Sequence, residues 1–503
     1  MINLLDCTLR DGGYYTLWDF ETTLIKQYCY LMAKLPIEYI EIGYRSIEKD
    51  DYFGEFYYSP VDSLRNIKSR LNKSQKISLM LNAKDCTDID LAKLLSKCFG
   101  LVSLVRIATD PEKIEHSLKI AKTLKSLGYQ VAINIMYISK INQGHTIFQH
   151  IKNIDTSVDY LYLVDSYGSV YPDDLEKTIK LFQQNCNVAL GFHGHNNLEL
   201  AFINSLRAIE CGVNIIDSTI LGMGRGAGNL KLELILTHLN AKKDLNIDLN
   251  SLSQLNELFS PLMNKYKWGT NLPYMVSGSY ALPQEDVMNA IRINRYSIAS
   301  IVNTMNSNTV NELQTFQCPT DSKNCIIIGG GSSIEKHYAA ITKYLMLNQH
   351  IVIIHSTSKY INKFSTFKNK QFFCIAGDEL TKLNNSQYDF IDHFIFGPSP
   401  RKINVKIPHN STSYELKKID FIDKFHDSPL SISLQTALDM KVKNIELIGF
   451  DGYIELNSQK ELYLMQENQL IISTFLKIQQ KIISLTKTNY KDLLKQSIYT
   501  KVA

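Results

Sequence analysis

Short apolar runs alternate with longer stretches of helical periodicity through the first 240 residues of the chain. The runs that we interpret as strands are Asn3 to Leu9, Tyr39 to Gly43, Ile77 to Leu81, Leu101 to Ile107, Val131 to Met136, Tyr160 to Val164, Val188 to Phe192 and Ile215 to Ile220. Between them, stretches such as Glu21 to Ala33 and Pro111 to Leu127 repeat apolar residues at the spacing of an amphipathic helix. Eight strand–helix units of about 25 to 30 residues fit a TIM (β/α)8 barrel better than a doubly wound open sheet.

The rhythm changes after this region. Residues 246–316 read as a helical extension, with helices expected at Leu252 to Tyr266 and Glu285 to Met305. Polar, turn-prone residues around Asn306 to Asn308 and Cys318 to Ser322 mark its end. Because 503 residues exceed what one core usually serves, we expect a barrel at 1–245, the helical extension at 246–316 and a second domain at 317–503.

The second domain is expected to be a Rossmann-like α/β fold. It opens with a buried strand ending near Ile328 and continues into a helix from Ile334 to Asn348. Between the two lie Gly329, Gly330, Gly331 and Ser332. Backbone N–H groups at such a turn could hold the phosphate of a nucleotide or nucleotide-sugar, although a tight turn without a ligand explains the same residues equally well.

Charge and apolar content exclude some partner classes. Lys and Arg number 54 against 50 Asp and Glu, and no basic run is interleaved with aromatic residues, so we expect no nucleic-acid partner. The chain enters its first strand without a signal-peptide pattern and contains no apolar run of about 18 residues, which predicts a cytoplasmic protein without a membrane span. Nine cysteines without CxxC spacing fit reduced thiols in that compartment.

Two segments carry residues that can hold a divalent metal ion. His193 and His195 occupy alternate positions of a strand, so both side chains project from one face and two imidazole nitrogens can reach one ion. The Asp11 carboxylate would complete a three-ligand set, which suits Mn, Zn, Fe or Co and leaves Mg open. Taken alone, the two histidines fit a solvated strand face equally well.

Five motifs give these residues a context. In chain order they are Thr8-Leu9-Arg10-Asp11-Gly12, Glu41-Ile42-Gly43, Asp165-Ser166-Tyr167-Gly168, His193-Gly194-His195 and the loop Gly222 to Asn229. On these motifs, roughly the first 300 residues resemble the metal-dependent lyase and synthase barrels. That family includes 4-hydroxy-2-oxovalerate aldolase, hydroxymethylglutaryl-CoA lyase, isopropylmalate synthase and the carboxyltransferase domain of pyruvate carboxylase. The resemblance implies a barrel enzyme that makes or breaks carbon–carbon bonds.

The resemblance also implies roles for single residues. Asp11, His193 and His195 would bind the divalent ion (Mn, Mg, Zn or Co), and Asn229 would add a weak fourth contact. Arg10 would steady the enolate oxygen, because a guanidinium stabilises the negative charge that proton removal next to a ketone leaves on oxygen.

Other polar residues near strand ends would support this chemistry. We expect Glu41 to hydrogen-bond Arg10 within the catalytic group, and Asp165 and Asn134 to belong to the substrate pocket. In 4-hydroxy-2-oxovalerate aldolases a His stands three residues after the Asp of the motif, whereas this chain has Tyr14 and Tyr15 in that region. A tyrosine passes a proton only if its pKa falls well below about 10, or through water. Tyr14 therefore stays open as acid/base or as a stacking wall, and Tyr15 is assigned to the substrate.

The leading hypothesis is a metal-dependent aldolase, acting as a homo-oligomer. It would form or cleave a 4-hydroxy-2-oxo acid through a pyruvate-type enolate, with a 2-keto acid and an aldehyde as substrates. Residues 11–20 resemble a subgroup of these barrels attached to surface-polysaccharide gene sets. One alternative is a Claisen-type acyl-CoA synthase or lyase. Another is a nucleotide-sugar transferase working through the second domain, since the segment ending in Gly449-Phe450-Asp451 resembles bacterial sialyltransferase-like domains and adds Asp451 to the candidate nucleotide contacts.

Overall fold

The chain divides into two compact units, Met1–Met288 and Asn289–Ala503, which are described separately. The computed structural model describes residues 2–85, 88–152, 154, 157–243, 246–283, 287–288, 313–317, 322–377, 389–398, 412–453, 459–478 and 481–503. The sequence-predicted helix at residues 285–305 lies almost entirely outside these described residues.

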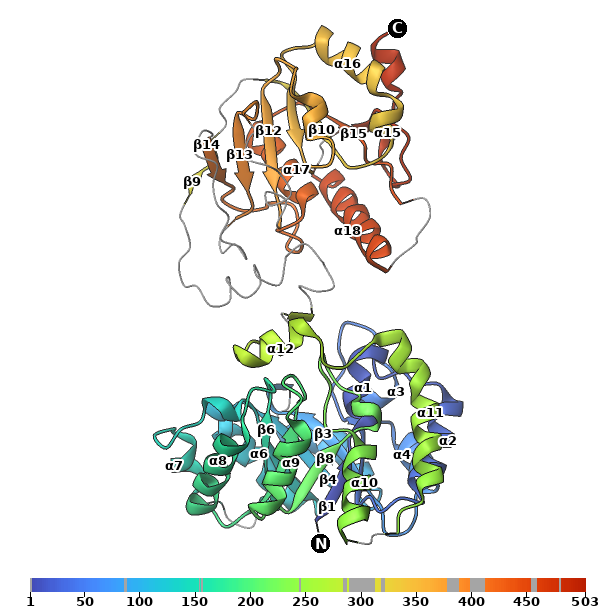
Figure 1. Ribbon diagram of the computed structural model, residues 1–503, viewed down its shortest axis with the longest axis vertical. Coiled ribbons are helices and arrows are strands. Elements are labelled where there is room, and N and C mark those ends of the chain that lie inside the picture. The colour runs from blue at the N-terminus through green and yellow to red at the C-terminus, as the bar shows by residue number, and fades with distance from the viewer. Residues whose placement is uncertain are drawn as a thin grey trace. The chain divides into compact units, whose positions relative to one another are not determined.

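The first unit is built on a closed barrel of eight parallel strands that follow one another in chain order (Figure 1). The strands are β1 (Asn3–Asp6), β2 (Tyr39–Tyr44), β3 (Lys76–Asn82), β4 (Val102–Thr109), β5 (Gln130–Ile135), β6 (Tyr160–Asp165), β7 (Ala189–Gly194) and β8 (Ile215–Ser218). Pairing of β1 with both β2 and β8 closes the sheet. The predicted TIM barrel is therefore confirmed, and all eight predicted strands occur.

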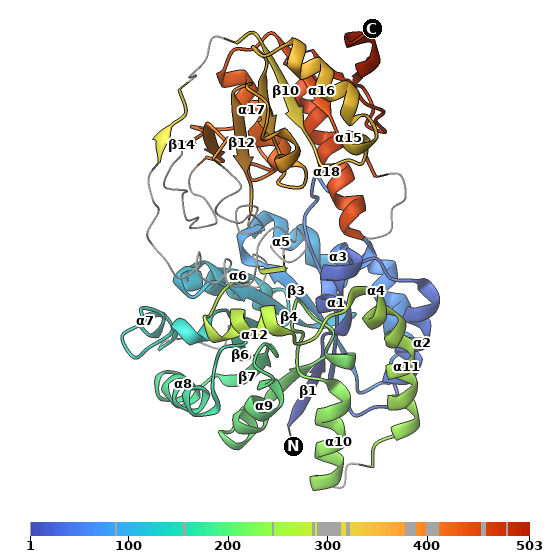
Figure 2. The ribbon, with the colours of Figure 1, turned by 45° about the horizontal axis from the view of Figure 1, so that its top comes forward.

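Helices surround the barrel (Figure 2). They are α1 (Thr8–Thr16), α2 (Thr22–Met32), α3 (Glu55–Tyr58), α4 (Val61–Lys68), α5 (Asp88–Leu95), α6 (Ile114–Ser126), α7 (Ile147–Ile151), α8 (Pro172–Asn185), α9 (Ala201–Glu210) and α10 (Leu232–Lys243). Apolar residues of these helices pack in the barrel core; in α6, for example, Ile120, Ala121 and Leu124 are buried. Burial of these residues fixes the strand ends, where the loops carry the polar motifs.

The end of the first strand differs from the prediction. We expected a strand through Leu9, but β1 stops at Asp6 and α1 begins at Thr8. The Asp6 carboxylate accepts hydrogen bonds from the Thr8 backbone N–H (3.2 Å) and from the Thr8 hydroxyl (2.7 Å), which satisfies a donor at the start of the helix. As a result Arg10 and Asp11 lie in the first turn of a helix directly after the strand.

Two further helices, α11 (Leu249–Tyr266) and α12 (Leu272–Ser279), follow the barrel within the first unit. Asp248 caps α11 by accepting from the backbone N–H groups of Asn250 and Ser251, and Asn271 caps α12 through Tyr274. The second of these helices touches the strand ends, because the Asn197 amide, just after the two candidate histidines, donates to the carbonyl of Tyr274 (3.1 Å).

The second unit contains an open, all-parallel sheet of nine strands in the order β17-β16-β15-β10-β11-β12-β13-β14-β9. The strands are β9 (Gln314–Thr315), β10 (Asn324–Ile328), β11 (Val352–His355), β12 (Gln371–Ile375), β13 (His393–Phe396), β14 (Thr412–Glu415), β15 (Asn444–Ile448), β16 (Ile482–Ser484) and β17 (Leu494–Lys495). The helices are α15 (Ser333–Lys336), α16 (Tyr338–Leu347), α17 (Pro429–Asp439) and α18 (Gln459–Leu476).

Helices cover both faces of this sheet. Side chains of β10 alternate between the faces, so Ile327 packs in the cluster that contains α17 and α18, while Ile326 and Ile328 pack in the cluster that contains α16. The single helix predicted from Ile334 to Asn348 is interrupted at His337. Strand β9 pairs with β14 although the sequence assigned its residues to the helical extension.

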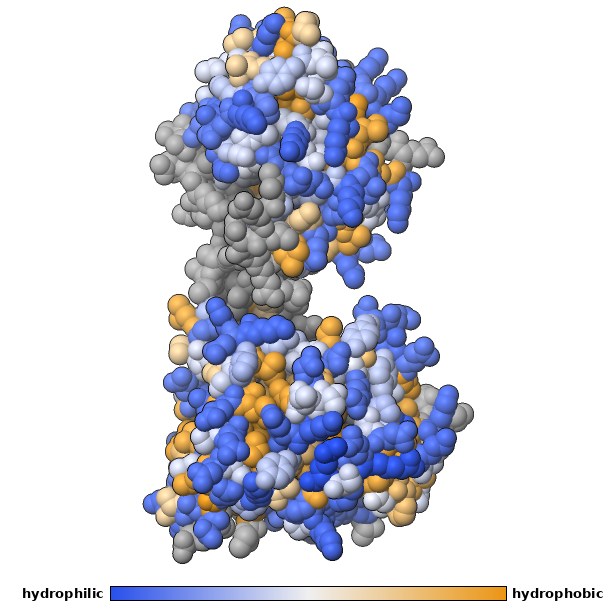
Figure 3. All heavy atoms as spheres, turned by 90° about the vertical axis from the view of Figure 1, so that its right-hand side faces the viewer, coloured by the Kyte–Doolittle hydropathy of each residue, from blue (hydrophilic) through white to orange (hydrophobic). Residues whose placement is uncertain are grey.

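Hydrophilic side chains dominate the face of each unit drawn in Figure 3, with smaller apolar groups among them. Within the residues that the structure covers, no helix combines the length and the apolar character needed to cross a membrane.

The second unit should lose stability in mild acid because it buries a neutral histidine. His355 is fully buried and hydrogen-bonds the side-chain oxygen of Gln371 (2.8 Å), and burial lowers the pKa of His355 to about 4 from its ordinary 6.5. Below about pH 6.5 the unfolded chain binds a proton at His355, whereas the folded unit binds it only below about pH 4. Stability therefore falls as pH falls through this window, by about 3 kcal/mol in all.

Hydrogen exchange of peptides covering β11 and β12 should accelerate between pH 7 and pH 4.5, after correction for the intrinsic rate. His355→Asn should flatten this dependence and the exposed control His426→Asn should not; equal profiles for the two variants would refute the assignment.

Candidate metal centre

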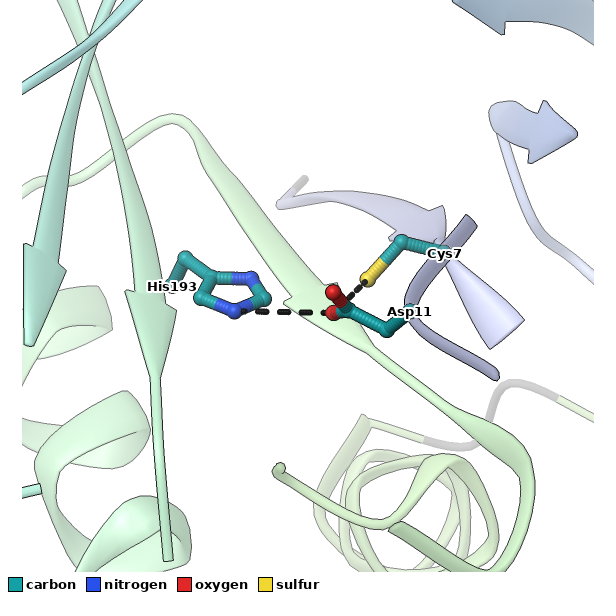
Figure 4. A group of neighbouring side chains, drawn as sticks. All are labelled: Cys7, Asp11 and His193. Carbon is teal, nitrogen blue, oxygen red and sulfur yellow. Dashed lines mark hydrogen bonds and ion pairs between the residues drawn. The ribbon is translucent and has the colours of Figure 1, made fainter. Parts of the chain in front are cut away.

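Three ligand-type side chains meet at the carboxyl ends of the strands: Cys7, Asp11 and His193 (Figure 4). Cys7 lies between β1 and α1, Asp11 in the first turn of α1, and His193 on β7. One ligand atom from each lies within 4.8 Å of the others, and all three residues are buried. The Nε2 atom of His193 is 3.7 Å from Asp11 Oδ2.

Both histidines are oriented through their Nδ1 atoms. His193 Nδ1 donates to the Asp217 carboxylate and His195 Nδ1 donates to the backbone carbonyl of Asp165, each over 2.8 Å. Each bond places the proton on Nδ1, so Nε2 keeps a lone pair that can bind a metal ion. Burial lowers the pKa of His195 to about 3, which keeps this imidazole neutral at ordinary pH.

Asn229 reaches the same point from the loop after β8. Its Nδ2 donates to Asp11 Oδ2 (2.7 Å), while its Oδ1 is buried with no hydrogen-bond donor. The loop turns tightly: a Cβ on Gly228, where φ is +77°, would lie 2.2 Å from the carbonyl oxygen of Gly222. Only glycine permits this backbone contact, and the contact brings Asn229 to Asp11.

The donor set fits a divalent cation. The Asp11 carboxylate, the Nε2 lone pairs of His193 and His195 and the orphaned Oδ1 of Asn229 are all acceptors. A cation between them would satisfy these acceptors, and imidazole with carboxylate suits Mn, Zn, Fe or Co. Burial raises the pKa of the Cys7 thiol well above its ordinary value, so Cys7 stays protonated and lies 3.6 Å from Asp11 Oδ2 as a weak donor.

Arg10 lies beside these acceptors. Its Nε donates to Glu41 Oε2 (2.8 Å) and its Nη1 pairs with Asp11. Burial alone would lower the pKa of Arg10, but Asp11 and Glu41 raise it well above the usual range. Glu41 therefore makes the contact with Arg10 that the sequence predicted, and Arg10 keeps its positive charge next to the candidate ligands.

A second buried arginine was missed by the sequence analysis. Arg106, on β4, pairs with Glu41 (Nη1, 3.1 Å) and Asp217 (Nη2, 2.5 Å) inside the barrel. Its guanidinium lies over the Tyr162 ring at 4.1 Å and donates to Asn134 Oδ1 (3.2 Å). This network links Glu41 to the partner of His193. The sequence did offer a signal, because Arg106 and Asp217 are charged residues that each lie within an apolar strand run.

Tyr14 and Tyr15, which follow the first motif, contact different parts of the barrel. The Tyr14 hydroxyl lies 2.9 Å from that of Tyr44, whereas Tyr15 stacks on Tyr266 (5.5 Å between ring centres) and approaches Trp268. Burial raises the pKa of Tyr15. Tyr15 thus packs toward α11, and Tyr14 stays with the strand-end residues.

The Asp165 carboxylate stabilises the loop that follows β6. Its carboxylate oxygens accept from the backbone N–H groups of Ser169 (3.0 Å) and Val170 (3.2 Å), and burial raises its pKa to about 6. Its carbonyl accepts from His195, so Asp165 positions a candidate ligand. Contact with substrate stays a prediction for Asp165, Asn134 and Tyr15.

In the second unit, the glycine-rich turn lies next to Asp451, which follows β15. The Asp451 carboxylate accepts from the Ser333 backbone N–H (2.9 Å) and from the Ser333 hydroxyl, and a Cβ on Gly331 would lie 2.4 Å from it. The turn from Gly329 to Ser332 therefore carries a carboxylate of this chain at the start of α15, where a phosphate would meet negative charge. Nucleotide binding stays a prediction.

Relatives of known name match the barrel. A 4-hydroxy-2-oxovalerate aldolase of Pectobacterium atrosepticum is 28% identical over 239 residues, which cover 47% of this chain and 68% of the relative. An oxaloacetate decarboxylase of Mycobacterium tuberculosis is 26% identical over 243 residues, covering 48% of this chain and 71% of the relative. A crystal structure described as the N-terminal domain of a "putative aldolase" from Bacteroides vulgatus is 45% identical, with a TM-score of 0.58, and covers 60% of this chain and 99% of that domain.

The family model described as HMGL-like matches residues 1–259, which include every candidate ligand and the loop that carries Asn229. By this match, and by the barrel and strand-end residues described above, the chain belongs to the HMGL-like family.

Proposed function

We propose that the protein is a divalent-metal-dependent aldolase that forms or cleaves a 4-hydroxy-2-oxo acid through a pyruvate-type enolate. Relatives in the HMGL-like family are named as an aldolase and a decarboxylase, which are both enzymes of carbon–carbon bonds. The observation that carries the proposal is that His193 and Asn229 both reach Asp11 beside the Arg10 guanidinium, with the ring of His195 5.1 Å from that of His193.

Asp11, His193, His195 and Asn229 would hold the ion. When bound, a divalent ion supplies Lewis-acid polarisation of a keto oxygen. Arg10 would donate to the oxygen that becomes negative as the proton leaves the methyl group of the keto acid. Glu41 fixes the Arg10 guanidinium through Nε, and Asp217 fixes the His193 ring through Nδ1.

Proton transfer is assigned to Tyr14. Its hydroxyl is paired with the hydroxyl of Tyr44, and its ring is held edge-on by Trp18 at 4.9 Å between centres. A paired hydroxyl can pass a proton along the pair while one oxygen faces substrate or water. Tyr15 lacks this geometry, because it stacks on Tyr266.

The aldehyde partner is proposed to be of sugar type, in the synthesis of a surface-polysaccharide component. The resemblance of residues 11–20 to polysaccharide-associated barrels supports this part of the proposal. An acyl-CoA substrate would instead make the barrel a Claisen-type enzyme.

Deuterium exchange tests the proposal. The full chain is treated with a chelator, divided, and given Mn²⁺, Mg²⁺ or no metal in heavy water; proton NMR then follows the methyl signals of pyruvate and, separately, of acetyl-CoA. We expect exchange into pyruvate only in the metal-loaded samples, with recovery to the untreated rate. Exchange into acetyl-CoA alone would replace the aldolase by the synthase, and exchange into neither would refute enolate chemistry.

A further inference from the structure

A third arginine, Arg225, lies near the candidate metal centre, against the ring of Tyr14. It belongs to the loop after β8, three residues before Gly228, and its guanidinium carbon lies 4.3 Å above the centre of the Tyr14 ring. Arg225 is half-buried. The cation is thus held by an aromatic face.

The other two arginines of the centre are neutralised by carboxylates. Arg10 pairs with Asp11 and Glu41, and Arg106 pairs with Glu41 and Asp217. In the described part of the chain, Arg225 forms no ion pair with a carboxylate. A half-buried cation that lacks an acidic partner carries a desolvation cost, which a bound anion would offset.

The charge of Arg225 also reaches Tyr137, which follows β5. Burial and the neighbouring Tyr167 raise the pKa of Tyr137, and Arg225 opposes that rise. Arg225 is therefore close enough to Tyr137 for the two side chains to interact.

Tyr137 belongs to a pair of aromatic rings next to a lysine. Tyr137 and Tyr167 lie with ring centres 5.1 Å apart, and both rings are within 5.5 Å of Lys140 Nζ. Aromatic faces with nearby cations suit a polyhydroxylated carbon chain that ends in an anionic group.

We infer that Arg225 binds an anionic group, a phosphate or a carboxylate, carried by the aldehyde partner, so that the acceptor is an acidic hydroxyaldehyde. This inference rests on the proposed aldolase function only in naming the bound molecule an aldehyde. Binding of the anionic group does not depend on catalysis. The keto acid has its own cation, because Arg10 contacts Asp11 directly, whereas Arg225 lies over the Tyr14 ring.

Binding of unreactive analogues tests the inference. The full chain, loaded with Mn²⁺, is titrated calorimetrically with glycerol 3-phosphate, glycerate, glycerol and the pyruvate analogue oxamate. The variants are Arg225→Gln, the charge-retaining Arg225→Lys, and Arg207→Gln as a control on α9, where Arg207 pairs with Glu176 and Glu210 on the surface. Melting temperatures verify that each variant folds.

Glycerol 3-phosphate, glycerate or both should bind the native chain more tightly than glycerol. Arg225→Gln should weaken that binding at least about tenfold, Arg225→Lys should restore part of it, and Arg207→Gln should leave it unchanged. Loss confined to glycerol 3-phosphate identifies a phosphate, and loss confined to glycerate a carboxylate. Equal binding by the native chain and Arg225→Gln, no preference for the anions over glycerol, or a loss confined to oxamate would overturn the inference. Pyruvate exchange measured on the same samples shows separately whether the aldolase proposal holds.

Discussion

Replacing Asp11 by asparagine will reduce metal-dependent deuterium exchange into pyruvate by at least about 10³-fold. The Asp11 carboxylate lies within reach of the His193 ring, the Asn229 amide and the Arg10 guanidinium, and it is the only carboxylate in the cluster of metal-type ligands that the described residues form. Asparagine keeps the shape and one oxygen but removes the charge. Loss of an outer contact to a metal ligand costs about 10- to 100-fold in affinity or activity, and loss of the charged ligand itself should cost more.

The measurement combines metal content after dialysis with the initial rate of exchange at saturating Mn²⁺. Asp62→Asn is the matched control, since Asp62 is an exposed carboxylate on α4 that pairs with Arg65. Arg10 keeps Glu41 as a partner in the variant, so the fold should persist. Retention of one bound metal ion and of exchange within tenfold of the native rate would remove Asp11 from the ligand set.

Most of the barrel could be predicted from the sequence because its signal is local. Each strand is a short apolar run between amphipathic helices, and each was identified within a few residues of its observed bounds. The prediction was wrong at Thr8, where a single Asp6 carboxylate starts a helix inside an apolar run. In the second unit, β16 and β17 have only three and two residues, too few for a periodic pattern.

The candidate site was also predicted only in part. The spacing of His193 and His195 and the glycine loop before Asn229 are sequence patterns. The structure brings His193 and Asn229 to Asp11 and places the ring of His195 5.1 Å from that of His193. Arg106 could not be assigned, because its value to the site comes from partners 65 and 111 positions away along the chain, Glu41 and Asp217. The divergence of Tyr14 from Tyr15 depends on Tyr44 and Tyr266, which adjacency in sequence does not reveal.

The largest loss of stability in the barrel is expected for Arg106→Met. Arg106 is fully buried, and its ion pairs with Glu41 and Asp217 are closed to solvent. Methionine fills a similar volume but leaves two buried carboxylates with one cation fewer. Removing one member of a buried ionic group costs about 3 to 5 kcal/mol, because the remaining charges stay desolvated. For a unit of this size the loss corresponds to a fall of roughly 10 °C in melting temperature.

Chemical denaturation of the full chain, followed through tryptophan fluorescence, measures this loss, since Trp18 and Trp268 both belong to the first unit. Arg207→Met is the matched control, because the same substitution on the surface of α9 removes exposed pairs and should change stability by less than about 1 kcal/mol. Arg106→Met should lower the free energy of unfolding less in an Asp217→Asn background than in the native chain. In that background the Asp217 charge, which would otherwise lose its arginine partner, is already absent. Additive losses would show that the arginine stabilises the barrel by packing on Tyr162, where its guanidinium lies 4.1 Å from the ring centre, and that the buried charges are independent of it.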